Sequence, residues 1–595
     1  MNLSTPKWDC LNESRDGLLF FSQRLDEMLF SYTIDLYRVP VLNTHLLLRE
    51  YISVYRDRAI NDKYLKQIYE ELRDSLNSDV VISHYWGRDN IDRTLDAFKS
   101  IPGDARLSFV EYLLHVIGET KYYEWCRDYV KMIVRQNGQK EKIEGLLRCL
   151  IPELIGHGYT PQFIYWYNKK MLLNSTDPSI DTFIDRFDRK PREYKVYIAA
   201  EKLIEKFKEL ISCRLQFSFD DDGNFQKFYK TRGRPKPQKD QVIFYFDGIK
   251  ALDEQAASRK AFEKISLFLK FYSAVDNKPT PIFHETAMVI DSVNESTSYV
   301  SFGLTEYNVI QGMKLDEASD YTEQLISNLV SHARCSIDQL TKIIDLHNNS
   351  LRSPDYNGSF LNLWSALEVL SMETVGEDTL SQVSETLLPV LGLNYYQSVF
   401  DNLTKQLEGA LSTEDYSSLL AKIEEGDTPR QKIATLILHN KYDDLRASLS
   451  GQLAQYPVIR FRLHTLHHFA DNHKSLLSPC TRYIERVRWH LSRIYRTRNA
   501  IVHSGNTPSY IRNLGEHLHY YLDVLLFECF NRLCNGTQLC KSEIALFDAY
   551  LSFKSLRNRF SDKNEITFDD IAELVEPHHS KQVAFEYTCD CESRT

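Results

Sequence analysis

The feature that most constrains the fold is a long helical pattern between Ser478 and Gly505, followed directly by a second one. Ser478-Pro479 is a good helix start and Gly505 a good helix stop, with about 25 residues between them. The second pattern opens at Thr507-Pro508. Apolar residues line one face of each helix at three- and four-residue steps or multiples of them: Ile484, Val487, Leu491, Ile494 and Ile501, then Leu514, Leu518, Tyr521, Leu522, Leu525 and Cys529. The sequence therefore predicts a helical hairpin.

Polar and charged side chains gather at the end of the first of these helices. Arg498 falls on the apolar face, where an unpaired charge is costly, so it needs a partner or a purpose. A neighbouring polar stripe carries Ser492, Arg496, Asn499 and His503. Asn499 lies one turn before His503 and is expected to orient its ring, while the helix dipole favours a charged imidazolium. A permanent cation beside a histidine suits phosphodiester chemistry.

Arg498 and His503 do not point in one direction from a single helix. They are five residues apart, which corresponds to about 140° of rotation at 3.6 residues per turn. They border one groove, and two copies of the helix packed across a seam would bring both arginines and both histidines together. The spacing is therefore a geometric reason to expect a homodimer or a higher homo-oligomer.

The corner of the hairpin resembles the signature of HEPN domains, in the stretch Tyr495-x-x-Arg498-Asn499-Ala500-Ile501-Val502-His503-Ser504-Gly505. Residues 360–370, FLNLWSALEVL, resemble the helix that opens these domains. The group most similar in character is the Apea-like HEPN group of bacterial anti-phage defence proteins. The resemblance covers residues from about 355 to 540.

The resemblance implies a C-terminal HEPN helical bundle that dimerises and acts as a metal-independent endoribonuclease. Arg498 and His503 would be its catalytic pair, with Asn499 as the polar residue that follows the arginine. Glu368 matches an acidic residue of the opening helix and, with Arg496, would support the site. No cofactor and no metal are expected. Cleavage would use the 2'-hydroxyl as nucleophile and leave a 2',3'-cyclic phosphate, which restricts the substrate to RNA.

A basic segment surrounds the motif in a chain whose net charge is −10. Between Arg460 and Arg512 stand ten basic residues against two acidic ones, a local charge of +8. Such a segment attracts a polyanion, and we expect Arg462, Arg488 and Arg493 to contact RNA phosphates. The residues alone leave open whether Arg496 or Arg498 makes the main phosphate contact, and the family match favours Arg498.

The chain divides by pattern into five parts. Residues 1–212 are expected to form a mostly helical regulatory or sensor region, and residues 213–315 a small α/β module. A long connecting helix within 316–354, a HEPN-like helical domain at 355–545 and a C-terminal tail at 546–595 complete the chain. The expected fold class is mainly α.

Individual elements follow from periodicity and from turn residues. Helices of the N-terminal region are expected at 16–36, 62–76 and 195–211. Strands of the middle module are expected at 241–246, 287–290 and 299–304, with a helix at 256–273 between the first two.

Composition places the chain among ordinary globular proteins, with 43% hydrophobic and 26% charged residues. No apolar run approaches the ~18 residues that span a bilayer, and the N-terminus lacks a secretory pattern. The 11 cysteines are mostly scattered within expected helices and strands, which suits reduced thiols. A cytoplasmic protein without a membrane partner is expected.

The family analogy extends to regulation. A nuclease lethal to its own cell needs restraint, so residues 1 to about 350 are expected to sense an invader or to hold the nuclease inactive. A phage-derived trigger is then a possible partner, acting in anti-phage defence or abortive infection.

Three other interpretations remain open from the residues alone. Arg498 and His503 could be structural, with Arg498 paired to Glu368, and the bundle could be a non-catalytic dimerisation module that binds RNA or a partner. The same site could transfer nucleotidyl or other phosphoryl groups. A metal site could form from closely spaced side chains before the hairpin: His464, His467, His468, Asp471 and His473.

Overall fold

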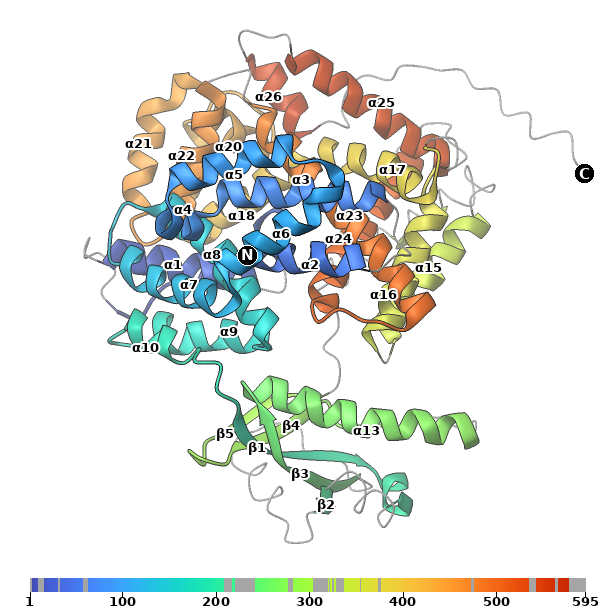
Figure 1. Cartoon of the computed structure of the whole chain (residues 1–595). Coiled ribbons are helices and arrows are strands. Elements are labelled where there is room, and N and C mark those ends of the chain that lie inside the picture. The colour runs from blue at the N-terminus through green and yellow to red at the C-terminus, as the bar shows by residue number, and fades with distance from the viewer. Residues whose placement is uncertain are drawn as a thin grey trace, which may run out of the picture.

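The computed structural model describes residues 3–8, 15–29, 33–56, 62–207, 217–219, 241–276, 282–302, 319, 322–323, 326–327, 337–353, 355–372, 376–471, 476–534, 542–561 and 566–576. These residues are mainly helical and include one small antiparallel sheet, which confirms the expected fold class. Figure 1 shows the helices gathered in one body, with the sheet and its long helix α13 (Glu254–Asp276) below it.

The N-terminal helices include those expected at 16–36 and 62–76, which are α1 and α3. The first of these is shorter than expected. The elements are α1 (Asp16–Leu29), η2 (Asp35–Tyr37), α2 (Thr44–Arg56), α3 (Asp62–Ser78), α4 (Val80–Trp86), α5 (Arg88–Ser100), η3 (Gly103–Ala105), α6 (Arg106–Ile117), α7 (Glu119–Ile133), α8 (Lys140–His157), α9 (Pro161–Asn168), η4 (Lys169–Leu173) and α10 (Ile180–Asp185).

The sheet has the strand order β2-β3-β1-β4-β5, and each neighbouring pair is antiparallel. Helix α13 covers one face, where its Ala257, Ala261 and Ile265 are buried against the sheet. The strands expected at 241–246, 287–290 and 299–304 correspond to β3, β4 and β5. The bounds are β1 (Arg192–Glu201), β2 (Phe217–Phe219), β3 (Gln241–Ala251), β4 (Thr286–Asp291) and β5 (Thr297–Ser301).

The helix expected at 195–211 is wrong, because this segment begins within the central strand β1. The strand pairs with β3 on one side and β4 on the other, and the turn η5 (Lys202–Phe207) follows it. Val196 and Ile198 enter the core under α13, while Tyr197 enters a small cluster on the opposite face. A strand buried on both faces has a continuous apolar run, whose spacing also fits a helix.

The C-terminal helices begin after a stretch in which most of residues 316–336 lie outside the described residues. Residues 542–576, mostly within the expected tail, carry two helices, and residues 577–595 lie outside. The elements are α15 (Ile337–Arg352), α16 (Tyr356–Leu370), α17 (Thr379–Leu393), α18 (Tyr395–Ala410), α19 (Thr413–Ala421), α20 (Pro429–Leu438), η7 (Asn440–Tyr442), α21 (Asp443–Gln452), α22 (Pro457–Asp471), α23 (Ser478–Ser504), α24 (Ile511–Cys534), α25 (Ser542–Ser561) and α26 (Phe568–Val575).

The expected helical hairpin is present as α23 and α24. Leu477 rather than Ser478 takes the N-cap position of α23, and Gly505 ends the helix with a φ of 68°. This left-handed conformation favours glycine, and the Gly505 N–H donates to the Ile501 carbonyl at 3.1 Å. The apolar face expected on α24 is fully buried at Leu514, Leu518, Tyr521, Leu522, Leu525 and Cys529.

One hydrophobic core joins the N-terminal and C-terminal helices, although the two sets are far apart in the sequence. It contains Phe20 and Ile151 from the first set, and Leu363 and Leu491 from the second. The rings of Phe20 and Phe461 meet edge to face, with centroids 5.3 Å apart. The sheet module has a core of its own.

Candidate functional site

The last turns of α23 carry the motif residues. Arg498 is half-buried, and its Nη1 donates to Asn499 Oδ1 at 3.1 Å. Within the described part of the chain, Arg498 forms no ion pair, and exposed His503 makes no hydrogen bond. Asn499 therefore holds the guanidinium of Arg498 and does not orient the ring of His503 as the spacing predicts.

Arg496 lies two residues before Arg498 but in different surroundings. It is buried, and its guanidinium donates to Ser492 Oγ at 2.9 Å and to Glu50 Oε1 at 3.0 Å. A guanidinium that is paired with a buried carboxylate stabilises the fold and is not free to bind a ligand. The guanidinium of Arg496 is therefore engaged inside the protein, whereas that of Arg498 has no carboxylate partner among the described residues.

Glu50 of α2 is the centre of a buried charge network that sequence analysis missed. Its carboxylate accepts from Arg493 at 2.8 and 2.9 Å as well as from Arg496, and Arg493 also donates to Glu71 of α3 at 2.6 Å. Burial raises the pKa of Glu50, but the charges of Arg493 and Arg496 outweigh this effect and lower it to about 2. The pKa of Glu71 is raised, because burial and the nearby Glu50 charge outweigh Arg493.

The three arginines expected to bind RNA occupy different environments. Arg493 is fully buried in the Glu50 network, and Arg462 is buried with Glu27 and Gln406 as partners. These two predictions are not supported, because both guanidinium groups are already paired inside the protein. The Arg488 side chain is 41% exposed and lies 3.6 Å from Glu485, so it remains at the surface.

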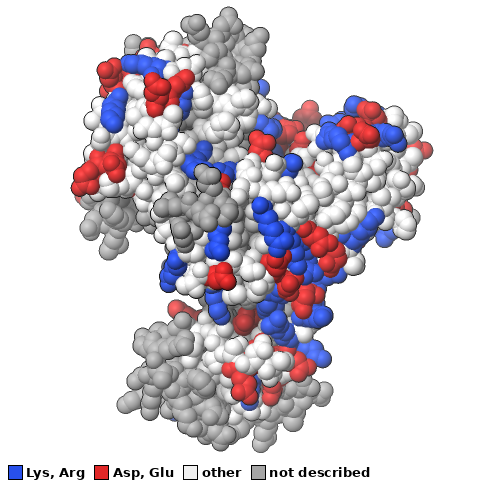
Figure 2. Space-filling view, turned by 90° about the vertical axis from the view of Figure 1, so that its left-hand side faces the viewer, with Lys and Arg blue, Asp and Glu red and all other residues white. Residues whose placement is uncertain are grey.

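The basic segment is thus largely an interface to the N-terminal helices. Five of its arginines form ion pairs with carboxylates that precede residue 75: Arg460 with Asp16, Arg462 with Glu27, Arg486 with Asp35, Arg493 with Glu50 and Glu71, and Arg496 with Glu50. These five carboxylates offset five of the eight net positive charges of the segment on folding. On the face in Figure 2, acidic and basic side chains likewise lie close together.

Helix α16, which corresponds to the expected opening helix, packs beside the motif helix. The rings of Trp364 and Tyr495 lie 5.7 Å apart, and Asn357 donates to Thr507 in the corner loop at 2.8 Å. Glu368 is half-buried on the same helix, and in the described part of the chain it forms no ion pair with Arg498. The structural pairing of these two residues is therefore not observed.

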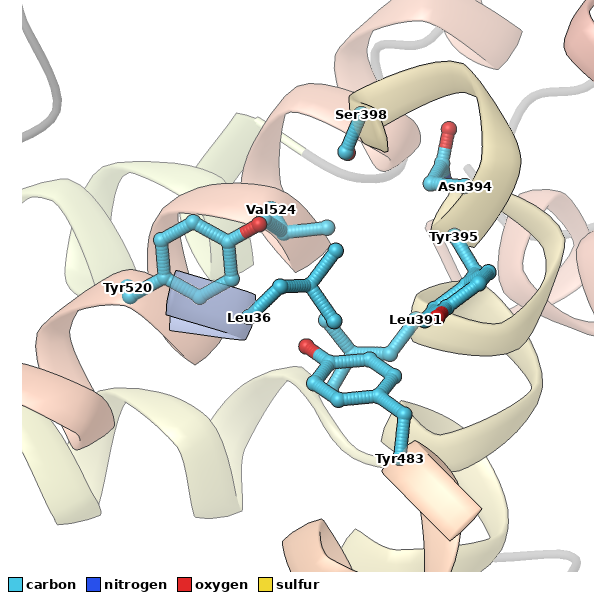
Figure 3. A pocket seen from close by; sticks show the side chains of 8 residues that line it. All are labelled: Leu36, Leu391, Asn394, Tyr395, Ser398, Tyr483, Tyr520 and Val524. Carbon is cyan, nitrogen blue, oxygen red and sulfur yellow. The ribbon is translucent and has the colours of Figure 1, made fainter. Parts of the chain in front are cut away.

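A second contact between the two sets of helices is made by the turn η2. Asp35 is fully buried and accepts from Arg486 Nη2 at 2.7 Å and from His517 Nδ1. Burial raises its pKa, but Arg486 and His517 outweigh burial and hold the pKa of Asp35 well below its usual range. The next residue, Leu36, lies between Tyr520 on one side and Leu391 and Tyr395 on the other (Figure 3).

This junction contains a small pocket but no space for a substrate. It has room for about one water molecule and is lined mainly by aromatic and aliphatic side chains. We therefore interpret it as a packing defect where η2 meets α17, α18, α23 and α24 (Figure 3).

The metal site considered before the hairpin does not form among the described side chains. Both ring nitrogens of His467 are engaged, Nδ1 with the Ile437 carbonyl at 3.0 Å and Nε2 with Arg446 at 3.1 Å. His464 and His468 are exposed. The side chains of Asp471 and His473 lie outside the described residues. A different cluster, His347 with His519 and Asp523, was missed by sequence analysis.

No family model, curated protein or solved structure matches the chain. The resemblance to HEPN domains therefore rests on the motif residues of the sequence alone. Among the described residues, no helix has the length and apolar character needed to cross a bilayer.

The Glu50 network makes a specific prediction for stability. Replacing Arg493 with alanine leaves Glu50 and Glu71 buried without their main cation, and we expect a loss of about 3–5 kcal/mol in the free energy of unfolding. Arg488→Ala is the matched control, because its exposed ion pair is worth at most ~1 kcal/mol. Denaturant unfolding of the full chain measures both. Equal effects of the two substitutions would contradict this assignment.

The lowered pKa of Glu50 predicts a pH dependence. A carboxyl whose pKa falls on folding stabilises the protein above its unfolded pKa of 4.5 and loses this contribution as the pH falls towards 2. The contribution is at most about 3 kcal/mol, at about 1.4 kcal/mol per pKa unit. Glu71, with its raised pKa, works in the opposite direction. The stability difference between wild type and Glu50→Gln should therefore shrink from pH 5 to pH 2, and a constant difference would count against the network.

Proposed function

We propose that this protein is a metal-independent endoribonuclease of the HEPN type. The observation that carries the proposal is the contrast at the end of α23: neighbouring Arg493 and Arg496 are buried in ion pairs, whereas Arg498 has no carboxylate partner among the described residues and stands near exposed His503. Five of the nine arginines between Arg460 and Arg512 pair with N-terminal carboxylates, and the lack of such a partner for Arg498 among the described residues supports its role as a phosphate contact.

The chemistry follows from the residue types. RNA cleavage without a metal requires removal of the 2'-hydroxyl proton, attack of that oxygen on phosphorus and protonation of the departing 5'-oxygen. His503 supplies an imidazole that can act as general base and then as general acid in these proton transfers. Arg498 binds the phosphate oxygens in a bidentate manner and stabilises the charge that develops on them. The products are a 2',3'-cyclic phosphate and a free 5'-hydroxyl.

A second copy of the chain completes the proposed site. On one helix, Arg498 and His503 differ by about 140° in direction and by about 7.5 Å in height. A homodimer that packs the ends of two α23 helices together brings two arginines and two histidines to one phosphate.

The N-terminal region would control the nuclease in the cytoplasm, in response to a phage-derived trigger. This part of the proposal rests on the resemblance to defence proteins and on the contacts of α23 with the N-terminal helices. Glu50 and Glu71 hold the motif helix one to two turns before Arg498, and the rings of Tyr64 and Tyr495 meet at 6.0 Å. A movement of α2 or α3 would therefore be transmitted to the motif.

The proposal predicts that purified protein cleaves RNA in the presence of EDTA. His503→Ala and Arg498→Ala should each lower the cleavage rate by about 10²–10⁴-fold, because the first removes proton transfer and the second removes phosphate stabilisation. An RNA with a single 2'-deoxy substitution at the cleavage position should resist cleavage there. The measurement is product formation on total RNA and on purified tRNA, followed by detection of the cyclic phosphate.

His464→Ala is the control, because this histidine is exposed and lies on α22. It should cleave as fast as wild type, and circular dichroism should show that all variants are folded. A His503→Ala variant that cleaves RNA at the wild-type rate would refute the nuclease. The bundle would then be a non-catalytic module for dimerisation or binding.

A further inference from the structure

Three side chains with metal-binding atoms meet between α15 and α24. His347 comes from α15, while His519 and Asp523 lie one turn apart on α24. His347 Nε2 is 2.9 Å from His519 Nε2 and 3.1 Å from Asp523 Oδ1. His519 Nε2 is 3.6 Å from Asp523 Oδ1. Two imidazole nitrogens and one carboxylate oxygen therefore form a small triangle.

The size of this triangle suits one metal ion. Two ligand atoms bound to a tetrahedral zinc ion at about 2.0–2.1 Å lie about 3.3–3.4 Å from each other. The observed distances of 2.9, 3.1 and 3.6 Å fall on both sides of this value. Side-chain movements of about half an ångström or less would bring all three atoms to bonding distance from one ion.

One nitrogen of the cluster has no hydrogen-bond partner among the described residues, whichever tautomer forms. One proton on His347 Nε2 can serve both His519 Nε2 and Asp523 Oδ1, but His519 must then carry its own proton on Nδ1. That nitrogen is buried and has no hydrogen-bond partner among the described residues. The opposite tautomer leaves the same nitrogen as an unpaired acceptor. An ion bound to Nε2 would also leave Nδ1 protonated and unpaired, so the case for a metal rests on the distances between the three ligand atoms.

The cluster lies mostly inside the protein. The side chains of His347, His519 and Asp523 are 19%, 0% and 10% exposed, so the cluster is largely shielded but reachable past His347. Two imidazoles and one carboxylate suit Zn²⁺, with a water molecule as the fourth ligand.

We propose that His347, His519 and Asp523 bind one divalent transition-metal ion, with zinc as the expected ion, and that this ion ties α15 to α24. The site is separate from the proposed nuclease, because His519 lies about 12 Å along α24 from the helix start near the motif corner. Its role is structural: α15 is the first long described helix after the sheet module, and the ion would hold it against the hairpin.

The affinity should be moderate rather than extreme. A histidine that binds a metal usually donates its second ring nitrogen to a carboxylate or a carbonyl, and loss of such support typically costs about 10–100-fold in affinity. His519 Nδ1 lacks this partner among the described residues.

The test is direct metal binding by the full chain. The protein is stripped with a chelator, dialysed and titrated with Zn²⁺ by calorimetry, and with Co²⁺ while its visible absorption is recorded. We expect one ion per chain and Co²⁺ bands of a four- or five-coordinate site. His347→Gln and Asp523→Asn should each weaken binding by more than ~10-fold, since they remove ligands rather than their outer support.

His464→Gln is the matched control, because it removes an exposed histidine on α22 and should leave binding unchanged. His347 is partly exposed and Asp523→Asn preserves shape, so circular dichroism should show both ligand variants folded. Failure of the wild type to bind Zn²⁺, or equal binding by wild type and both ligand variants, would overturn the site. RNA cleavage by His347→Gln in EDTA is a separate readout that tests the nuclease and not the metal.

Discussion

The buried pairing of Arg493 and Arg496 with Glu50 determines how the rest of the molecule is arranged. These three charged groups can be buried together only if each is paired with an opposite charge, because an unpaired buried charge costs several kcal/mol. The network therefore fixes the position of α23 against α2 and α3, which lie more than 400 residues earlier in the chain. Asp35, with Arg486 and His517, repeats this arrangement two to three turns further towards the start of α23.

This pairing also divides the arginines of the basic segment into those that pair with N-terminal carboxylates and those that do not. In the sequence they look alike, and their summed charge indicates a surface for a polyanion. In the folded protein most of them form ion pairs with N-terminal carboxylates. Their charge is therefore largely neutralised where the C-terminal helices contact the N-terminal helices. What distinguishes Arg498 is position: it lies in the last two turns of α23, beyond the reach of Glu50. The polyanion surface is therefore much smaller than composition indicates.

The elements that sequence analysis predicted well are those with local signals. Gly505 and the apolar periodicity gave the bounds of α23, and the strands β3 to β5 had clear turn residues around them. Local spacing failed for β1, because burial on both faces removes the alternation that marks a strand. It also failed for Glu50 and His347, whose partners lie 443 and 172 residues away along the chain. The sequence around each of these two residues contains no pattern that predicts a partner so far away along the chain.

The shared core limits how activity could be controlled in the proposed nuclease. Full release of the N-terminal helices would expose the apolar surface around Phe20 and break several buried ion pairs, so it would amount to unfolding. Control must then act through small displacements of helices that stay docked. The sheet module is a better candidate for a moving part, because it has a separate core and its polar contacts with the body are few among the described residues. Asp253 accepts from Thr160, and Arg186 donates to the Leu252 carbonyl. A trigger that binds the sheet could shift α9 and its neighbours without dismantling the core that positions Arg498.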